Sequence, residues 1–195
     1  MTSNQEREVL LTGIGGQGVQ LAAKVLALAA TFEDLEVMSL GTYGGTMRGG
    51  NTDATVVIGR QPIVSPPIVS RAWSAIVVHP RYFEAIERKL RDDGMIIVDA
   101  DLLEEALPTA RAEVLAVDAT TRARDVDAPK AAALVLLGAF VAATGIVSAH
   151  AIERALEASL PSYRRQTLDS NLRALHAGRE AVESLSYPAW TSEAA

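Results

Sequence analysis

Glycines near the start of the chain are the residues whose type and spacing best suit the binding of a ligand. Gly13, Gly15 and Gly18 fit the pattern G-x-G-x-x-G, with Gly16 and Gln17 between them. An apolar run precedes them and an alanine-rich run follows, which predicts a strand, a tight turn and a helix. Free N–H groups at the start of such a helix favour an anion, typically phosphate. The same glycines could instead only allow close packing of helix and strand, and the spacing leaves both interpretations open.

The residues around this turn argue against a dinucleotide-binding site and exclude a P-loop. A dinucleotide site needs an acidic residue about 20 positions further on, at the end of the second strand, to bind the ribose. The second apolar run ends in Gly41 and Thr42, and Glu36 stands at its start instead. A P-loop needs Lys followed by Ser or Thr, where this chain has Val19 and Gln20. A free-standing dinucleotide enzyme therefore remains only as an alternative.

A second glycine-rich stretch follows the second predicted strand. It contains Tyr43, Gly44, Arg48, Gly49 and Gly50. A guanidinium between glycines can make bidentate contacts to a carboxylate, a phosphate or a neighbouring backbone, and a tyrosine can stack or donate a hydrogen bond there. A solvated arginine in a surface turn fits the spacing equally, so the residues leave this choice open.

Little else in the chain suggests catalysis or metal binding. His79, His150 and His176 are far apart, and none lies in a spacing typical of metal ligands. The acidic pairs 92–93 and 104–105 fit solvated helix ends better than acid–base dyads, and no G-x-S-x-G motif occurs. We therefore expect no catalytic residue and no metal ligand in this chain.

The composition of the chain argues against several further classes of protein function. The sequence of 195 residues has no cysteine, so it can form no disulfide, thiolate nucleophile or cysteine-ligated iron–sulfur cluster. Its net charge of −6 and the lack of a basic cluster argue against nucleic acid as a partner. The polar segment 1–8 lacks the pattern of a signal peptide, and we expect a cytoplasmic protein. The uncharged segment 131–149 fits a buried helix better than a membrane span.

Short apolar runs alternate with helical patterns along most of the chain, and this alternation predicts an α/β fold. We expect a three-layer α/β/α sandwich with a largely parallel sheet and a helical C-terminal segment. The predicted strands lie near 8–12, 36–40, 54–59, 75–78, 95–99 and 114–118, and the predicted helices span 19–30, 81–91, 102–107, 127–144, a segment from 149 and 165–184. Asp127 and Ser148 are the predicted N-caps of two of these helices.

The whole chain is predicted to be one domain. Within 1–195, an α/β core covers 8–125, a helical part covers 126–185 and a tail covers 186–195. The tail carries Tyr187 and Trp190, which suit docking on a partner and equally suit packing on the chain's own core.

Several motifs together resemble the gamma subunit of 2-oxoacid:ferredoxin (or other acceptor) oxidoreductases. They are the first glycine motif at 13–18, the second with Tyr43-Gly44 and Arg48-Gly49-Gly50, and a Pro-Ile with Ser-Pro at 62–66. Leu137-Gly138 and the later Asn171, Ala174 and Gly178 also fit, so the resemblance covers about 8–183.

The resemblance implies a subunit of a complex that oxidatively decarboxylates a 2-oxoacid to an acyl-CoA. Such complexes use thiamine diphosphate with Mg, CoA and [4Fe-4S] clusters, held mainly by other subunits, and pass electrons to ferredoxin or another acceptor. The implied partners are alpha, beta and delta-type subunits, and this chain alone would be inactive. A module that binds CoA or another anion without chemistry is a further alternative.

Carried over to this chain, the resemblance implies that both glycine motifs bind a cofactor or a partner. The implied residues are Gly13, Gly15, Gly16, Gln17 and Gly18 in the first motif, and Tyr43, Gly44, Arg48, Gly49 and Gly50 in the second. We expect both loops to leave the carboxyl ends of neighbouring strands, facing the thiamine pocket of the catalytic subunits.

The chain departs from the pattern where Gly45-Thr46, Ala133 and Trp73 replace the usual Pro-Glu, Asn and Asp. These changes hint at a substrate other than pyruvate, such as an aromatic or bulkier 2-oxoacid.

Overall fold

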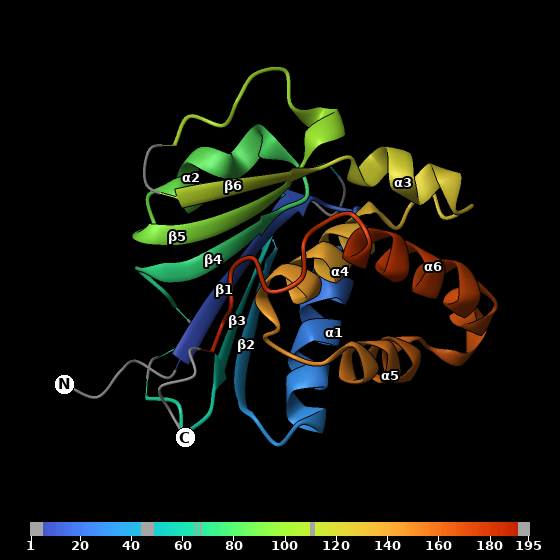
Figure 1. Cartoon of the computed structure of the whole chain (residues 1–195), viewed down its shortest axis with the longest axis horizontal. Coiled ribbons are helices and arrows are strands. Elements are labelled where there is room, and N and C mark those ends of the chain that lie inside the picture. Colours follow the sequence, from blue (N-terminus) through green and yellow to red (C-terminus); the bar gives the residue numbers. More distant parts are fainter. Residues whose placement is uncertain (1–5, 44–48, 65, 67, 110–111, 191–195) are drawn as a thin grey trace.

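A computed structural model describes residues 6–43, 49–64, 66, 68–109 and 112–190. Within these ranges six strands form one sheet, in the order β2-β3-β1-β4-β5-β6 (Figure 1). The strands are β1 (Glu6–Ile14), β2 (Glu36–Tyr43), β3 (Asn51–Gly59), β4 (Ala72–Val77), β5 (Leu90–Asp99) and β6 (Ala112–Val117). Strands β1, β4, β5 and β6 are mutually parallel, which confirms the predicted α/β fold with a largely parallel sheet.

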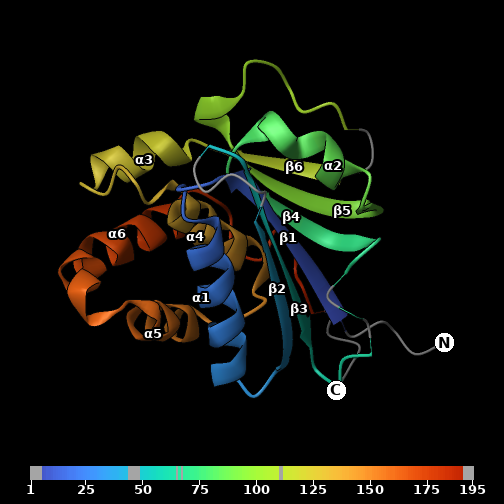
Figure 2. The same ribbon diagram turned by 180° about the vertical axis from the view of Figure 1, so that it is seen from behind.

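Helices cover both faces of this sheet, but unequally (Figures 1 and 2). The larger layer contains α1 (Val19–Phe32), α3 (Ala119–Asp125), α4 (Ala132–Thr144), α5 (Ala149–Ser159) and α6 (Leu168–Arg179). The other face carries α2 (Phe83–Glu87), with the short 3-10 helix at Pro80–Tyr82 before it. Side chains therefore form two apolar clusters, one on each face, and β1 supplies Leu11 to one and Leu10 to the other. An apolar run that is buried on both faces is typical of a central parallel strand.

Strand β3 lies between β1 and β2 and is antiparallel to both. The expectation that β1 and β2 are neighbours was therefore wrong. The reason is that the second glycine-rich stretch joins β2 and β3, which pair as antiparallel neighbours along their full length. Because both β1 and β2 oppose β3, they still run in the same direction, and their carboxyl ends lie at one edge of the sheet.

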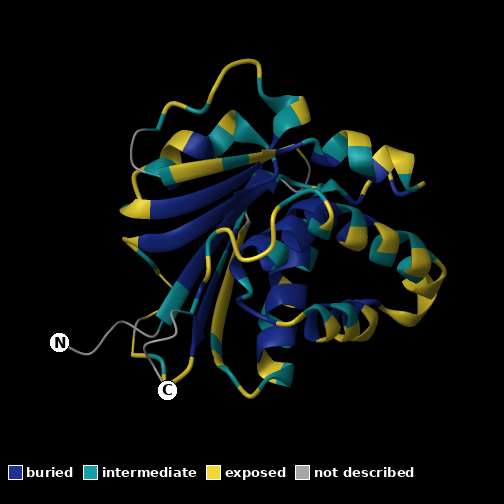
Figure 3. Ribbon diagram, in the orientation of Figure 1, coloured by how far each residue is buried: buried dark blue, intermediate teal, exposed yellow. Residues whose placement is uncertain are grey.

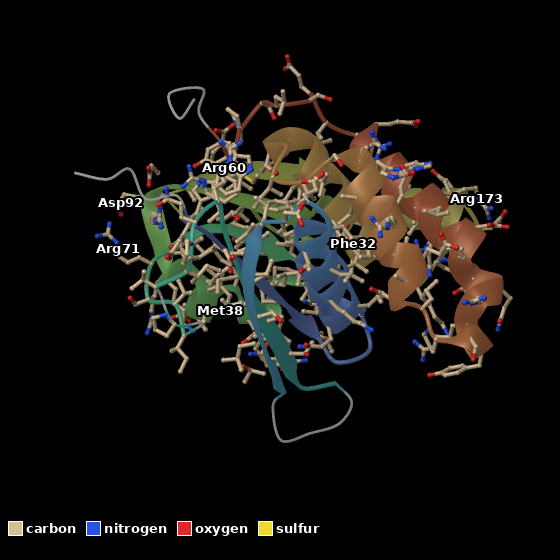
Figure 4. All side chains as sticks on the ribbon, turned by 90° about the horizontal axis from the view of Figure 1, so that it is seen from below. Phe32, Met38, Arg60, Arg71, Asp92 and Arg173 are labelled. Carbon is tan, nitrogen blue, oxygen red and sulfur yellow. The ribbon has the colours of Figure 1, made fainter. Side chains whose placement is uncertain are left out.

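Strand β2 is one of the two exposed edge strands of the sheet, and β6 is the other. Met38 and Leu40 are 42% and 40% exposed, whereas β4 is buried along its whole length. Figure 3 shows this contrast, with buried residues concentrated in the central strands and in α4. Figure 4 labels Met38 on this strand and Phe32 at the end of α1, where the guanidinium of Arg154 from α5 lies 4.0 Å from the centre of the phenyl ring.

Helix α4 is the buried element of the C-terminal part. Eleven of its 13 residues are buried, and Gly145 ends it in the left-handed conformation with φ +58°. Its close neighbour is α6: a Cβ on Gly138 would lie 2.0 Å from the Leu175 carbonyl oxygen, and one on Gly178 would lie 1.8 Å from that of Val135. No helix in the described ranges has the length and apolarity to cross a membrane, in keeping with the expected buried helix.

Other element boundaries differ from the predictions. The helix predicted over 81–91 ends at Glu87, because Leu90–Asp93 already belong to β5, and the helix predicted over 102–107 is absent beyond a 3-10 turn at Ala100–Leu102. Helix α3 was not predicted. The predicted cap Asp127 has φ +57° instead, in the connection between α3 and α4, so α4 begins only at Ala132.

The boundaries of the last two helices agree only in part with the prediction. The side chain of Ser148 caps α5 by accepting a hydrogen bond from the Ala151 N–H, as predicted. The last helix starts with a 3-10 segment at Ser162–Thr167 and ends at Arg179, five residues short of the predicted end, so the prediction of its length was wrong.

The C-terminal segment packs on the chain's own core. The N–H groups of Leu185, Tyr187 and Ala189 donate to the carbonyls of residues 142, 143 and 144, which belong to the last turn of α4. These carbonyls have no partner within a helix, so the segment satisfies acceptors that would otherwise need water. The indole N–H of Trp190 donates to the Ile146 carbonyl. Of the two interpretations of this segment, packing on its own domain is the one observed.

Candidate functional site

The two glycine motifs meet at the carboxyl edge of the sheet. The Gly15 N–H donates a 2.9 Å hydrogen bond to the carbonyl of Gly50, just before β3 begins. This bond joins the turn after β1 to the connection between β2 and β3, although 35 positions separate the two glycines in the sequence. The structure thus brings together parts of both motifs that the sequence could only place on separate loops.

The first motif forms a turn that only glycine fits well. Gly16 and Gly18 have φ of +103° and +87°, in the left-handed region that other residues rarely adopt. Gly13 allows a close approach, because a Cβ there would lie 2.8 Å from a methyl of Val19. Gly16 and Gly18 therefore set the turn, and Gly13 allows the close packing of α1 against β1 that one of the two interpretations expects.

Gln17 closes this turn from inside. Its side-chain oxygen accepts a 2.8 Å hydrogen bond from the Ile14 N–H, and its own N–H donates to the Ile14 carbonyl at 3.1 Å. The residue is therefore fastened within the turn, and it also lines a small pocket beside it. Its side-chain amide nitrogen is the part of Gln17 that this bond does not use.

Polar side chains beside the motifs tie β1, α1 and β3 together. The hydroxyl of Thr12 donates to a carboxylate oxygen of Asp53 at 2.7 Å, and the amide of Asn51 donates to the other oxygen at 2.8 Å. On the α1 side of the sheet, the Gln20 amide donates to the Thr52 hydroxyl and to the Asp53 carbonyl. This network fixes the start of β3, and hence Gly50, relative to the first turn.

Sequence reasoning did not single out these polar residues. The side chain of Gln20, for example, is half-buried against β3. One signal was present: Thr12 is a hydroxyl residue within an apolar strand, and it is fully buried. A buried hydroxyl needs a partner, but only the register of β1 with β3 shows that the partner is Asp53.

A small pocket of about 200 Å³ lies next to the first turn. Its lining includes Gly16, Gln17 and Lys130, an exposed residue in the connection between α3 and α4. Asp99 also lines it, but its carboxylate accepts hydrogen bonds from the Ala119 N–H at 3.1 Å and from the Thr120 hydroxyl at 2.5 Å. The Asp99 charge is thus taken up by the start of α3, while Lys130 is a cation that sequence reasoning missed.

The chemistry that this arrangement offers is the binding of an anion. Helix α1 begins at the turn without a side-chain cap, and its first turn holds no acidic residue. Unpaired N–H groups at a helix start attract negative charge, and Lys130 adds a positive charge on the same side. No group in the pocket is placed as an acid–base pair, since the Asp99 carboxylate is already saturated with donors.

The second motif is described only in part. Gly49 has φ +79° and lies in open space, and Gly50 accepts the bond from Gly15. Tyr43 ends β2, although its side chain lies outside the described part of the chain. Gly44 and Arg48 also lie outside the described residues.

Histidines and metal ligands do not gather at this edge. In the described part of the chain, no group of three or more His, Asp or Glu side chains could hold a metal ion. His79 follows β4 at the same edge and accepts a hydrogen bond from the Arg81 N–H. Burial, and then repulsion by Arg81, lower the pKa of His79, which favours the neutral imidazole. His176 lies elsewhere, 2.8 Å from Glu153.

The largest cavity described, of about 800 Å³, lies away from the glycine motifs. It is lined by residues of α4 to α6 and of the C-terminal segment, with Glu33 and Trp190 among them. Glu33 already accepts a hydrogen bond from the Ser148 N–H at the start of α5. None of the described motif residues lines this cavity, so its size alone does not make it the functional site.

Comparison with known proteins gives consistent matches over nearly the whole chain. Residues 8–181 match the family described as Pyruvate ferredoxin/flavodoxin oxidoreductase. The 2-oxoglutarate synthase subunit KorC of Methanothermobacter thermautotrophicus is 34% identical, over 90% of this chain and 95% of that protein.

Solved structures agree with this match. The gamma subunit of a keto/oxoacid ferredoxin oxidoreductase from Geobacter sulfurreducens has a TM-score of 0.75 at 28% identity, covering 90% of this chain and 97% of that one. The pyruvate oxidoreductase subunit PORC from Thermotoga maritima has a TM-score of 0.76 at 28% identity, covering 92% and 98%. The match therefore extends from sequence to fold.

Proposed function

The chain belongs to the pyruvate ferredoxin/flavodoxin oxidoreductase family, and we propose that it is the gamma-type subunit of an enzyme complex of that family. The complex would oxidatively decarboxylate a 2-oxoacid to an acyl-CoA and pass electrons to ferredoxin or another acceptor. In this proposal the chain contributes no catalytic residue. Its relatives that are 2-oxoglutarate and pyruvate synthase subunits support this role, as does the coverage of 90% of this chain and 95% of the 2-oxoglutarate synthase subunit.

The cofactors of such a complex do not fit this chain's own residues. The sequence has no cysteine to ligate a [4Fe-4S] cluster, and no carboxylate group suited to Mg occurs in the described ranges. We therefore assign the clusters, and thiamine diphosphate with its Mg, to the alpha, beta and delta-type partners. The alternative of a free-standing dinucleotide enzyme lacks support from the relatives, none of which is named as one.

The observation that carries the proposal is the Gly15 to Gly50 bond at the carboxyl edge of the sheet. It holds the first turn and Gly50, the last residue of the second motif, in one surface at the edge where ligands of open α/β sheets bind. We propose that this surface faces the catalytic subunits near the thiamine pocket. There Gly15, Gly16, Gln17 and Gly18 would present backbone and amide groups, and Gly13, which is buried against Val19, would support the turn.

The second motif completes the proposed surface. Tyr43, Arg48, Gly49 and Gly50 would supply its remaining contacts, with Arg48 as the polar contact to a cofactor, the substrate or a partner backbone.

Lys130 favours a refinement of this proposal. Together with the start of α1, it suits a carboxylate or phosphate, so an anionic part of CoA, of thiamine diphosphate or of a partner could occupy the small pocket. Binding of an anion by the chain and assembly into the complex are compatible, because one surface would serve both.

The proposal can be tested by purifying the tagged chain from its native cells without oxygen. We expect thiamine-containing and cluster-containing subunits to co-purify, with broad iron–sulfur absorbance and acyl-CoA formation that depends on a 2-oxoacid. A panel of 2-oxoacids, including aromatic ones, then identifies the substrate. A chain that purifies alone and turns over a dinucleotide substrate would overturn the proposal.

A further inference from the structure

A second hollow at the carboxyl edge of the sheet differs from the glycine site in its chemistry. This groove, of about 520 Å³, lies between the segments 79–84 and 102–108. The first segment follows β4 and contains the start of α2, and the second follows the 3-10 turn after β5. We refer to the hollow between these two segments as the acidic groove.

The floor of the acidic groove is apolar. Phe83 is buried there, and Leu103 and Leu107 are half-buried against the apolar cluster to which Phe83 belongs. These leucines lie in a segment without regular secondary structure, so the periodicity of a helix or strand does not explain their partial exposure. An exposed apolar floor framed by polar residues is typical of an interaction site.

The rim of the groove carries an excess of carboxylates. Glu104 and Glu105 are exposed, and within the described part of the chain neither of them makes an ion pair. Glu84 also lines the groove and is paired with Arg88, while Arg81 is the lining cation and lies over the ring of Tyr82. Two uncompensated carboxylates beside an apolar floor suit a basic and apolar partner.

The acidic groove adjoins the glycine site. Leu102 lines both this groove and the small pocket that contains Gly16, Gln17 and Lys130. A partner segment that binds at the glycine turn therefore needs only a short extension to reach Leu103 and Leu107. The two hollows differ in the sign of their charge, since Lys130 lies at one and the carboxylates of Glu104 and Glu105 lie at the other.

We propose that the acidic groove binds a segment of another subunit of the complex, in which an apolar side chain is flanked by Lys or Arg. The apolar side chain would cover Leu103 and Leu107, and the basic residues would pair with Glu104 and Glu105. This inference rests on the proposed function, because it takes its partner from the same complex. The opposite charges of the two hollows would fix the orientation of that partner.

The test compares two double charge reversals in the full complex. Glu104→Lys with Glu105→Lys changes the rim, whereas Glu157→Lys with Glu183→Lys changes two exposed glutamates that do not line the groove. Each tagged chain is expressed with its partner subunits and purified over a range of salt concentrations. We expect the rim variant to bind its partners about tenfold more weakly at low salt, since like charges then face each other, and the control to bind as the wild type does.

A second measurement tests the contact directly. A carbodiimide joins carboxylates to nearby lysines, so we expect peptides around Glu104 and Glu105 to be cross-linked to a lysine of a partner subunit. The variant Leu107→Asn should also weaken binding while the isolated chain keeps its helical circular dichroism spectrum. If the wild-type chain co-purifies with no partner, the proposed function and this site are both wrong. If the wild-type complex forms and the rim variant forms it equally well, the acidic groove alone is refuted.

Discussion

Two sets of glycines in this protein use the missing side chain for opposite purposes. In the two glycine motifs, a Cβ on Gly16 or on Gly49 would meet no atom within 4 Å. Between α4 and α6, a Cβ on Gly138 or Gly178 would lie within 2.0 Å of a carbonyl oxygen of the other helix. The first set leaves backbone open to a partner, and the second set brings two helices into backbone contact.

The comparison separates two physical reasons for a glycine at a motif position. Gly16 and Gly49 need a left-handed backbone and have space around them, so their requirement is conformational. Gly138 and Gly178 have ordinary helical backbone and no space, so their requirement is steric. Substitutions in the two sets should therefore differ in kind. The helix pair should lose the most stability, whereas the turn should lose less stability and should also lose binding.

The largest expected effect is that of Gly178→Ala. The added methyl would overlap the Val135 carbonyl, which forces α6 away from α4, and the gain in helix propensity of about 1 kcal/mol cannot offset this. We expect the free energy of unfolding to fall by about 2 kcal/mol or more, as measured by urea denaturation. The control Ala177→Gly should cost about 1 kcal/mol, through helix propensity alone. A Gly178→Ala chain as stable as the wild type would remove the steric half of the comparison.

Asp53→Ala should have the next largest effect. It removes both acceptors of the polar network and leaves the buried hydroxyl of Thr12 without its 2.7 Å partner. We expect a loss of about 2 kcal/mol in the free energy of unfolding, and weaker binding of the partner subunits because Gly50 is no longer held near Gly15. Asp53→Asn keeps an acceptor oxygen and should lose less. If both variants are as stable as the wild type, this network does not support the site.

Gly18→Ala tests the conformational half of the comparison. A Cβ at this position would lie 3.5 Å from that of Ala133, which is ordinary contact, so only the backbone at φ +87° resists the change. We expect a cost of about 1 kcal/mol in the free energy of unfolding. Gly18→Asn should cost less, because asparagine tolerates the left-handed region better. If alanine and asparagine are as stable as glycine, the turn does not require this conformation.

Lys130→Gln should have the smallest effect on stability. Lys130 is exposed, so we expect the free energy of unfolding to change by less than about 0.5 kcal/mol. If its charge holds an anion at the glycine turn, acyl-CoA formation by the assembled complex should fall roughly tenfold, as expected for the loss of one hydrogen bond to a charged group. The control Lys89→Gln changes an exposed lysine that lines none of the pockets at this edge. An unchanged rate in Lys130→Gln would exclude Lys130 from the site.

Part of the fold followed from the sequence because local patterns determine it. The run before Gly13 predicted β1, the cap Ser148 predicted the start of α5, and the predicted helix 127–144 ends where α4 ends. Helix α3 was missed because its seven residues are four threonines or alanines, two arginines and an aspartate, without a clear apolar face. Its start is instead fixed by Asp99, 20 positions earlier in the chain.

The candidate site was predictable only in its glycines. The positive φ of Gly16 and Gly18 was expected from residue type, because glycine alone adopts that backbone readily. Lys130 and Asp53 were not expected, since each is an isolated polar residue whose neighbours in sequence say nothing of the turn. Both reach the site from other elements.

The sequence by itself determined the alternation of strands and helices, the conformation of the glycine turn and the lack of any thiolate ligand. Each of these depends on residue type or on contacts a few positions apart. The tertiary structure alone decided that β3 lies between β1 and β2, that Gly15 bonds to Gly50, and that Lys130 lies beside the turn. These features arise from pairing between segments distant in the chain, and local propensity does not encode which distant segments pair.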